Sequence, residues 1–199
     1  MKLFYFYLET TGVLHWRNGI HQIAGIIEVD GEIKETFNFK VRPNPAATID
    51  DKALEVGGVT KEQVLAYEPM ENVYKQLTQL LGKYVNKYDK SDKFYLVGFN
   101  NARFDDAFFK AFFVQNKDNY FNSWFWIESI DVMVLAAEKL RPIRKTMPNF
   151  KLSTVAKFMG IDVSEKKLHE ASYDIELTYL IYQKLMYDRD NKRDEKKQE

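Results

Sequence analysis

Three acidic residues lie far apart in the sequence, each in surroundings that could belong to a functional site: Glu9, Asp105 and Asp174. Glu9 directly follows the apolar run 3–8, which is typical of a buried strand. Residues 7 and 9 of a strand point to the same face, so two carboxylates there would form half of a divalent-metal site. Position 7 is a tyrosine. A single glutamate at the end of a strand is common, and Glu9 alone does not establish a site.

Asp105 follows a second apolar run, residues 94–99, after a short polar turn. It is therefore expected at the carboxyl end of a strand, where sites collect in open α/β sheets. Another interpretation is that Asp105 or Asp106 only stabilises the first turn of a helix through the helix dipole. This segment by itself does not decide between the two.

Asp174 lies in the sequence HEASYD and shares a helix face with the small residues Ala171 and Thr178. A carboxylate flanked by small side chains indicates contact with a close neighbour. His169 precedes this helix, and a histidine beside a metal-bound water is a natural general base because its pKa lies near neutrality. A histidine at this position is also often merely exposed. His15 and His21 have no carboxylate nearby in the sequence, and we assign them no role.

The elements that must position these residues follow from periodicity and turn signals. Asp30-Gly31 separates two strand-like runs and predicts a tight β-hairpin. Helical spacing of apolar residues predicts a helix from Met70 to Val85, and Gly160 is expected to end a later helix. Further expected elements are a strand at 94–99, an apolar run at 124–130, and helices at 103–115, from Asp131, at 151–160 and at 171–187. Three strands followed by alternating helices and strands predict a mixed α/β sheet with helices on its faces.

Composition limits the classes of protein that this chain can belong to. It has 199 residues, of which 45% are hydrophobic, enough for the core of one domain. Its formal net charge is zero, so any binding to nucleic acid must come from local clustering or bound metal. It has no cysteine and no apolar run long enough to span a membrane, and we expect a soluble, cytoplasmic protein without membrane association. The mixed-charge segment 188–199 has no apolar residue and is predicted to be a disordered tail after a domain of residues 1–187.

Taken in order, the motifs resemble the DEDDh family of 3′–5′ exonucleases, which includes the DNA polymerase III proofreading subunit and ribonuclease T. The resemblance extends from about residue 2 to residue 187. It rests on ETTG at 9–12, NNARFD at 100–105, Asp131 at a helix start, KLSTVAKFMGI at 151–161 and HEASYD at 169–174. It implies a ribonuclease H-like fold and hydrolysis of single-stranded nucleic acid from its 3′ end with two Mg²⁺ or Mn²⁺ ions.

The resemblance also implies roles for particular residues. Glu9, Asp105 and Asp174 match the acidic metal ligands, and His169 matches the histidine that takes a proton from water. Residues expected to contact or position the terminal nucleotide are Thr10, Thr11, Asn101 and Phe104. Asp131 matches a position that supports the fold, and we leave it out of the site.

Tyr7 departs from the family pattern Asp-x-Glu at the position of the ligand that would bridge both metals. A neutral phenol is a poor ligand for a hard cation, so the chain is expected to hold one ion or none. Three explanations stay open: a naturally degenerate exonuclease kept for binding, an altered copy of an active enzyme, or another oxygen that replaces the lost ligand. We expect a 3′–5′ exonuclease impaired by Tyr7, with a catalytically inactive nucleic-acid-binding or scaffolding subunit as the alternative. DNA and RNA are not distinguished, and a polymerase partner in trans is possible for a proofreading role.

Overall fold

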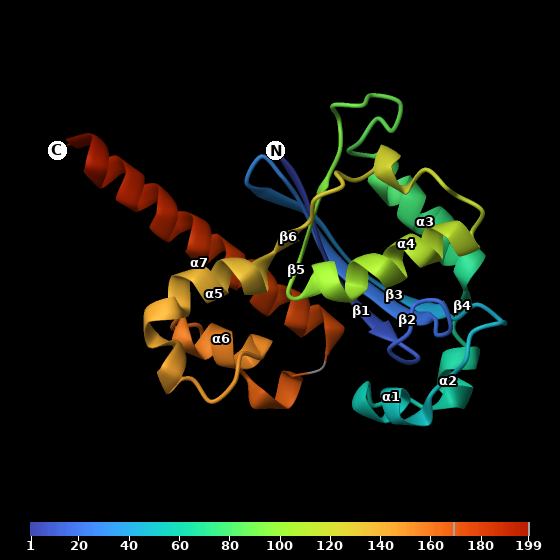
Figure 1. Ribbon diagram of the computed structural model, residues 1–199. Helices are drawn as coiled ribbons and strands as arrows, with labels where there is room; N and C mark the ends of the chain where they lie inside the picture. Colours follow the sequence, from blue (N-terminus) through green and yellow to red (C-terminus); the bar gives the residue numbers. More distant parts are fainter. Residues whose placement is uncertain (169, 199) are drawn as a thin grey trace.

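The computed structural model describes residues 1–168 and 170–198, with side chains described up to Tyr187 (Figure 1). The strands are β1 (Lys2–Thr10), β2 (Ile20–Val29), β3 (Glu32–Arg42), β4 (Glu68–Pro69), β5 (Tyr95–Gly98) and β6 (Ile130–Asp131). The helices are α1 (Asp51–Val56), α2 (Lys61–Leu65), α3 (Met70–Gly82), α4 (Asp105–Gln115), α5 (Val132–Leu140), α6 (Leu152–Phe158) and α7 (Ala171–Gln198). Short 3₁₀ turns cover Asn101–Arg103, Phe121–Ser123, Arg141–Thr146 and Glu165–Lys167.

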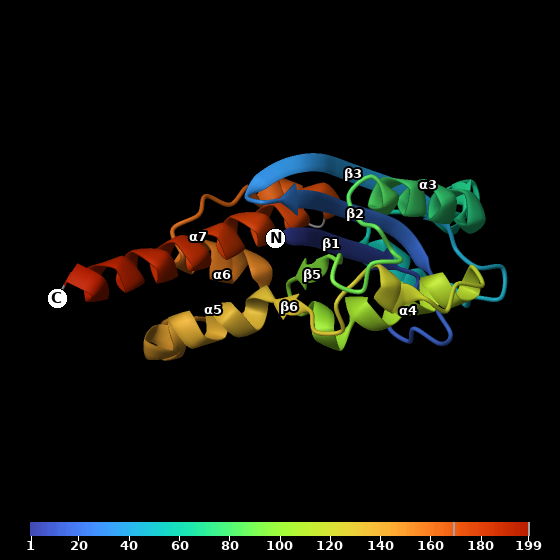
Figure 2. The ribbon, with the colours of Figure 1, turned by 90° about the horizontal axis from the view of Figure 1, so that it is seen from above.

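One sheet organises these elements, with its strands in the order β4-β3-β2-β1-β5-β6. β1 pairs antiparallel with β2 and parallel with β5, and β5 pairs parallel with β6. Figures 1 and 2 show α3 and α4 on one side of the sheet and α5, α6 and the first part of α7 on the other. The predicted mixed sheet flanked by helices, in a ribonuclease H-like fold, is confirmed.

The hairpin between β2 and β3 turns at Asp30 and Gly31, as the sequence predicts. Both residues have positive φ, 53° and 86°, which is the backbone of a tight turn matched to the twist of the strands. Beyond the turn, a bulge between Ile27 and Glu28 shifts the pairing by one residue. The shift decides which β3 side chains face α7, because a one-residue slip exchanges the two faces of a strand.

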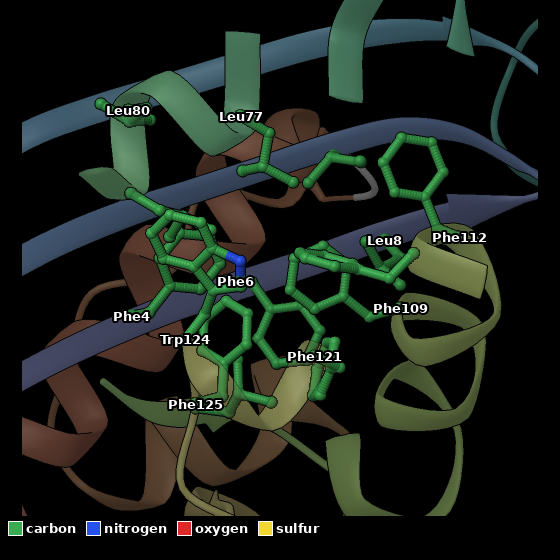
Figure 3. Close-up of a cluster of buried hydrophobic side chains, with 14 of the residues drawn as sticks. Phe4, Phe6, Leu8, Leu77, Leu80, Phe109, Phe112, Phe121, Trp124 and Phe125 are labelled. Carbon is green, nitrogen blue, oxygen red and sulfur yellow. The ribbon is translucent and has the colours of Figure 1, made fainter. Parts of the chain in front are cut away.

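β1 is buried on both faces because its side chains alternate between two cores. Phe4, Phe6 and Leu8 pack into an aromatic core with α3 and α4 (Figure 3), whereas Leu3 and Tyr5 pack under α5, α6 and α7. In the first core Phe109 is fully buried and contacts the rings of Phe4, Phe6, Phe113, Phe121 and Phe125 at centroid distances of 5.1–5.9 Å. The rings of this core hold α4 against β1.

Helix boundaries follow the local chemistry in several places. Asp131 begins α5 by accepting a hydrogen bond from the Met133 N–H at 2.9 Å, and it also accepts one from the Asn100 N–H at 2.9 Å. Asp131 is thus a helix cap that also fixes the turn after β5, as expected for a residue that supports the fold. Gly160, with φ of 70°, follows the end of α6 as predicted.

Other elements differ from the sequence-based expectation. The apolar run 124–130 forms an isolated bridge between Phe94 and Phe125 and only the two-residue strand β6, because the buried rings of Trp124 and Phe125 fill the aromatic core. The short elements α1, α2 and β4 were not predicted. The α7 backbone continues through the charged segment to Gln198, and the division into a domain of residues 1–187 and a disordered tail stays a prediction. Within the described part of the chain, no helix is long and apolar enough to cross a membrane.

Truncation of Phe109 is expected to loosen α4 and with it the position of Asp105, four residues earlier on the same helix face. Phe109→Ala should lower the free energy of unfolding by about 3–5 kcal/mol, because the side chain is fully buried among other rings. Urea unfolding followed by circular dichroism measures this change. Val114→Ala, on the same helix at a side chain that is 58% exposed, is the matched control and should change stability by less than about 0.5 kcal/mol.

Candidate active site

The site forms where β1 and β5 end at the same edge of the sheet, because these two strands run parallel. Glu9 lies near the end of β1, and the chain leaves β5 through the 3₁₀ turn Asn101–Arg103 into α4. Asp105 is the first residue of α4 and is buried, and its Oδ1 accepts a hydrogen bond from the Leu8 N–H at 3.2 Å. This bond ties the start of α4 directly to β1 beside Glu9.

Tyr7 lies near the predicted acidic ligands. Glu9 and Asp174, a buried residue of the first turn of α7, are both close enough to its hydroxyl to act on it electrostatically. Burial, followed by the negative charges of Glu9, Asp174 and Asp105, holds the pKa of the Tyr7 hydroxyl well above its usual value. The tyrosine is therefore a neutral phenol beside acidic side chains.

Two buried carboxyl groups of this site, those of Glu9 and Asp105, have raised pKa values. Burial, followed by the charge of Asp174, raises the pKa of Glu9 to about 7, although the hydrogen bond with Tyr7 and the charge of Lys40 act in the opposite direction. Burial is also the main cause that raises the pKa of Asp105 to about 7, against the opposing hydrogen bond from the Leu8 N–H. Near neutral pH both carboxyl groups are thus partly protonated in the metal-free protein.

The hairpin contributes polar residues that the sequence analysis did not assign to the site. Gln22 pairs with Glu9 across β1 and β2, and Lys40 pairs with Gln22 across β2 and β3. The Lys40 Nζ donates a hydrogen bond to Gln22 Oε1 at 2.6 Å. This row supplies a positive charge near Glu9. The predicted hairpin was a sequence signal that β2 and β3 pair. However, continuing the pairing from the Asp30-Gly31 turn without a bulge would place Gln22 opposite Phe39 instead of Lys40.

His21 also lies at the site, although we assigned it no role from the sequence. A bulge between the pairs Glu9–Gln22 and Thr10–Ile20 leaves His21 as the extra residue of β2. A methyl group at Gly57 would lie 3.6 Å from His21 Nε2 and 3.7 Å from Glu9 Oε2, so both side chains border the same backbone. His21 is buried, and burial lowers its pKa to about 4, which keeps the imidazole neutral.

The predicted nucleotide-contacting residues are all close to this edge of the sheet, but their side chains are engaged differently. Thr11 is fully buried, and its hydroxyl donates to Thr48 O at 2.9 Å and accepts from the Gly19 N–H at 2.9 Å. The Thr10 hydroxyl donates to Gly12 O at 2.7 Å. Contact of either threonine with a nucleotide stays a prediction.

Asn101 and Phe104 lie in the turn between β5 and α4. Asn101 is buried, and its amide nitrogen donates to Asp106 Oδ1 at 3.0 Å while its amide oxygen has no partner among the described residues. Phe104 is partly buried against Phe108, at a centroid distance of 5.0 Å. Their predicted contact with the terminal nucleotide remains untested.

The predicted general base, His169, lies outside the described residues. Among the residues that the structure describes, no three Asp, Glu or His side chains are grouped closely enough to hold a metal ion. The described side chains therefore do not fit a two-metal centre as they stand, and the neutral Tyr7 phenol near Glu9 and Asp174 supplies no anionic ligand. Metal ligation by Glu9, Asp105 and Asp174 stays a prediction.

Comparison with known proteins identifies the family of this chain. The family model described as RNase T exonuclease matches residues 6–182. The chain belongs to the exonuclease family. One similar protein is the PolC-type DNA polymerase III of Mycoplasmopsis pulmonis (strain UAB CTIP). It is 26% identical over 167 residues, which is 84% of this chain and 10% of that protein. The recognition of a DnaQ-like exonuclease domain from the sequence motifs is thereby confirmed.

Solved structures of E. coli exonuclease I share the fold of this exonuclease-family chain. The complex with a dT13 oligonucleotide has a TM-score of 0.71 and 22% identity, and covers 93% of this chain and 40% of that one. The zinc-bound form of the complex with single-stranded DNA has a TM-score of 0.74 and 23% identity, and covers 94% and 40%. The chain thus spans about a tenth of the polymerase and two fifths of exonuclease I.

The raised carboxyl pKa values predict that metal-free protein loses stability as the pH rises. Unfolded carboxyl groups titrate near pH 4, so between that pH and about 7 the folded protein binds more protons than the unfolded chain. Between pH 6.5 and 8.0, the free energy of unfolding in EDTA should fall by about 1 kcal/mol as Glu9 and Asp105 lose their protons. Urea unfolding at the two pH values measures this difference.

Most of the chosen pH interval lies above the range in which His21 titrates, from about 4 in the folded protein to 6.5 in the unfolded chain, where the dependence has the opposite sign. The control is Glu9→Gln/Asp105→Asn, which keeps the acceptor for the Leu8 N–H and should lose the decrease. An equal decrease in the wild type and the double variant would show that other groups cause it.

Proposed function

We propose that this domain binds the 3′ end of single-stranded nucleic acid and hydrolyses it as a metal-dependent 3′–5′ exonuclease whose activity is weakened by Tyr7. Family membership and the convergence of Glu9, Asp105 and Asp174 around Tyr7 support this proposal. The single observation that carries it is the position of Tyr7: one phenol lies near enough to Glu9, Asp174 and Asp105 that the charges of all three raise its pKa. Such an arrangement is expected for an exonuclease site that has lost one ligand.

The chain's own residues suit parts of this reaction. The partly protonated carboxyl groups of Glu9 and Asp105 would recover full negative charge beside a divalent cation, because an opposite charge lowers a carboxyl pKa. Such a cation supplies charge stabilisation for phosphodiester hydrolysis in two-metal sites. Tyr7 opposes this role because its hydroxyl stays neutral and supplies no negative charge for a cation.

A second function is favoured by the same position of the neutral Tyr7 phenol near Asp174 and Glu9. A phenol that holds the acidic group together without a cation would suit a catalytically inactive subunit that binds strands or supports an assembly. Exonuclease I of E. coli has been crystallised with a dT13 oligonucleotide, and strand binding in this chain would be retained under either function. The PolC-type relative places a similar domain within a polymerase, and we propose a polymerase as a possible partner in trans.

Restoring a carboxylate at position 7 should separate the two functions. With Mn²⁺, Tyr7→Asp is expected to shorten a 5′-labelled single strand from its 3′ end at least about 100-fold faster than the wild type, since metal stabilisation of the transition state amounts to several kcal/mol. Denaturing gels of a DNA strand and of an RNA strand of the same sequence measure the rate and distinguish the substrates. Tyr7→Phe is the matched control, which removes the hydroxyl without supplying a charge.

Slow but measurable metal-dependent degradation by the wild type, accelerated in Tyr7→Asp, supports the impaired enzyme. Equal fast degradation by both proteins would show that Tyr7 does not impair the site. Strand binding without degradation by either protein would favour the binding subunit. Absence of both binding and degradation in the wild type and Tyr7→Asp would reject both functions.

A further inference from the structure

Trp16 is unusual among the tryptophans of this chain because its indole lies on the surface. It is 73% exposed, whereas Trp124 is buried and Trp126 is partly buried. It belongs to the loop 11–19, which connects β1 to β2 and begins two residues after Glu9. Burying an indole is strongly favourable, so one held in solvent beside a candidate active site is available to a ligand.

The loop 11–19 is held in one conformation by its own hydrogen bonds. The Asn18 side chain accepts from the Leu14 N–H at 3.0 Å and donates to Thr11 O at 3.2 Å and Thr48 O at 2.8 Å. The Thr48 N–H donates in turn to Arg17 O at 2.7 Å. The residues on both sides of Trp16 are therefore fixed to neighbouring segments, which reduces the entropy lost when a ligand binds.

His15 supports the indole from the side of the protein. Its ring makes an edge-to-face contact with Trp16 at a centroid distance of 4.9 Å and another with Phe108 of α4 at 6.2 Å. Phe108 is buried in the aromatic core. A continuous series of rings thus connects the exposed indole to the helix that carries Asp105.

Charges around the loop favour contact with a base over contact with a phosphate. A surface hollow of about 480 Å³ beside the loop is lined by Arg17 and Lys52 but also by Asp50 and Asp51. These opposite charges give no net positive surface for a phosphate. An aromatic face is suited to a nucleobase whatever its sequence, because every base has a π-face.

We propose that Trp16 is a stacking surface for an unpaired base of a single strand whose 3′ end lies at the site around Glu9. This inference rests on the proposed function and assigns a residue that would contact the single strand upstream of its 3′ end. Stacking on an exposed indole requires a base that is free of its complementary strand. A fully paired 3′ end would lack this contact.

The test is binding of 3′-hydroxyl oligothymidylate by the full chain in EDTA, measured by fluorescence anisotropy of a 5′ label. Trp16→Ala should weaken binding by about 5- to 150-fold, the range observed when stacking on one base is lost. Trp16→Phe should retain most of the affinity. Tyr88→Ala is the matched control, since Tyr88 is an equally exposed aromatic residue (86%) in the loop between α3 and β5, and it should bind like the wild type.

A second measurement locates the stacked base. Single abasic sites are moved along the oligonucleotide from its 3′ end, and one position should weaken wild-type binding but leave Trp16→Ala unaffected, because the two changes remove the same contact. Quenching of tryptophan emission by the unmodified strand should occur in the wild type and in Trp126→Phe and disappear in Trp16→Phe.

Failure of this inference is distinguishable from failure of the proposed function. Wild-type binding that is unchanged in Trp16→Ala, or an abasic penalty of the same size in both proteins, would overturn the stacking role and leave the proposed function standing. No binding of any strand by the wild type would overturn both. Circular dichroism of each variant confirms that a weakened variant is folded, as expected for a side chain this exposed.

Discussion

The structure depends on β1 being buried on both faces. A central strand with an apolar side chain at nearly every position can be satisfied only when helices cover both sides of the sheet. Phe4, Phe6 and Leu8 on one face and Leu3 and Tyr5 on the other meet this requirement. Because both faces are packed, the end of β1 has little freedom, and Glu9 is held at a fixed place at the edge of the sheet.

The same double coverage brings together acidic residues that are distant in the sequence. The aromatic core holds α4 on one side of β1, and α7 packs on the other, so Asp105 and Asp174 approach the end of β1 from opposite faces. Carboxylates taken from water at short separation repel one another and resist ionisation. Tyr7 partly relieves this cost, because the neutral phenol near Glu9 lowers the pKa of that carboxyl group without a cation.

The site and the loop 11–19 also share mechanical support. Thr11 is bonded to Thr48 and Gly19, and the backbone of Asp50 is bonded to Thr11 O at 2.8 Å. The turn that follows Glu9 is therefore fixed to the segment that leads into α1. An exposed aromatic residue on such a loop differs from one on a mobile surface segment, because its position relative to Glu9 is set by the same contacts that hold the strand end.

The sequence by itself determined the local elements, the family and the acidic residues. The apolar run 3–8, the Asp30-Gly31 turn, the helical spacing after Met70 and the cap at Asp131 are local patterns. The expected strand, turn, helix and cap all formed, and the helix ends at Gly82 instead of Val85. Tertiary structure alone decided the setting of the site. Bulges after Glu9 and after Ile27 brought His21 and Lys40 beside it, and a bulge leaves no clear mark in a sequence because it depends on how two strands pair.

The exposure of Trp16 was likewise undetermined, since an aromatic residue in a loop is buried or exposed according to what packs above it. The raised pKa values of Glu9 and Asp105 arise because β1, α4 and α7 together bury these carboxyl groups. No single segment of the sequence shows that burial.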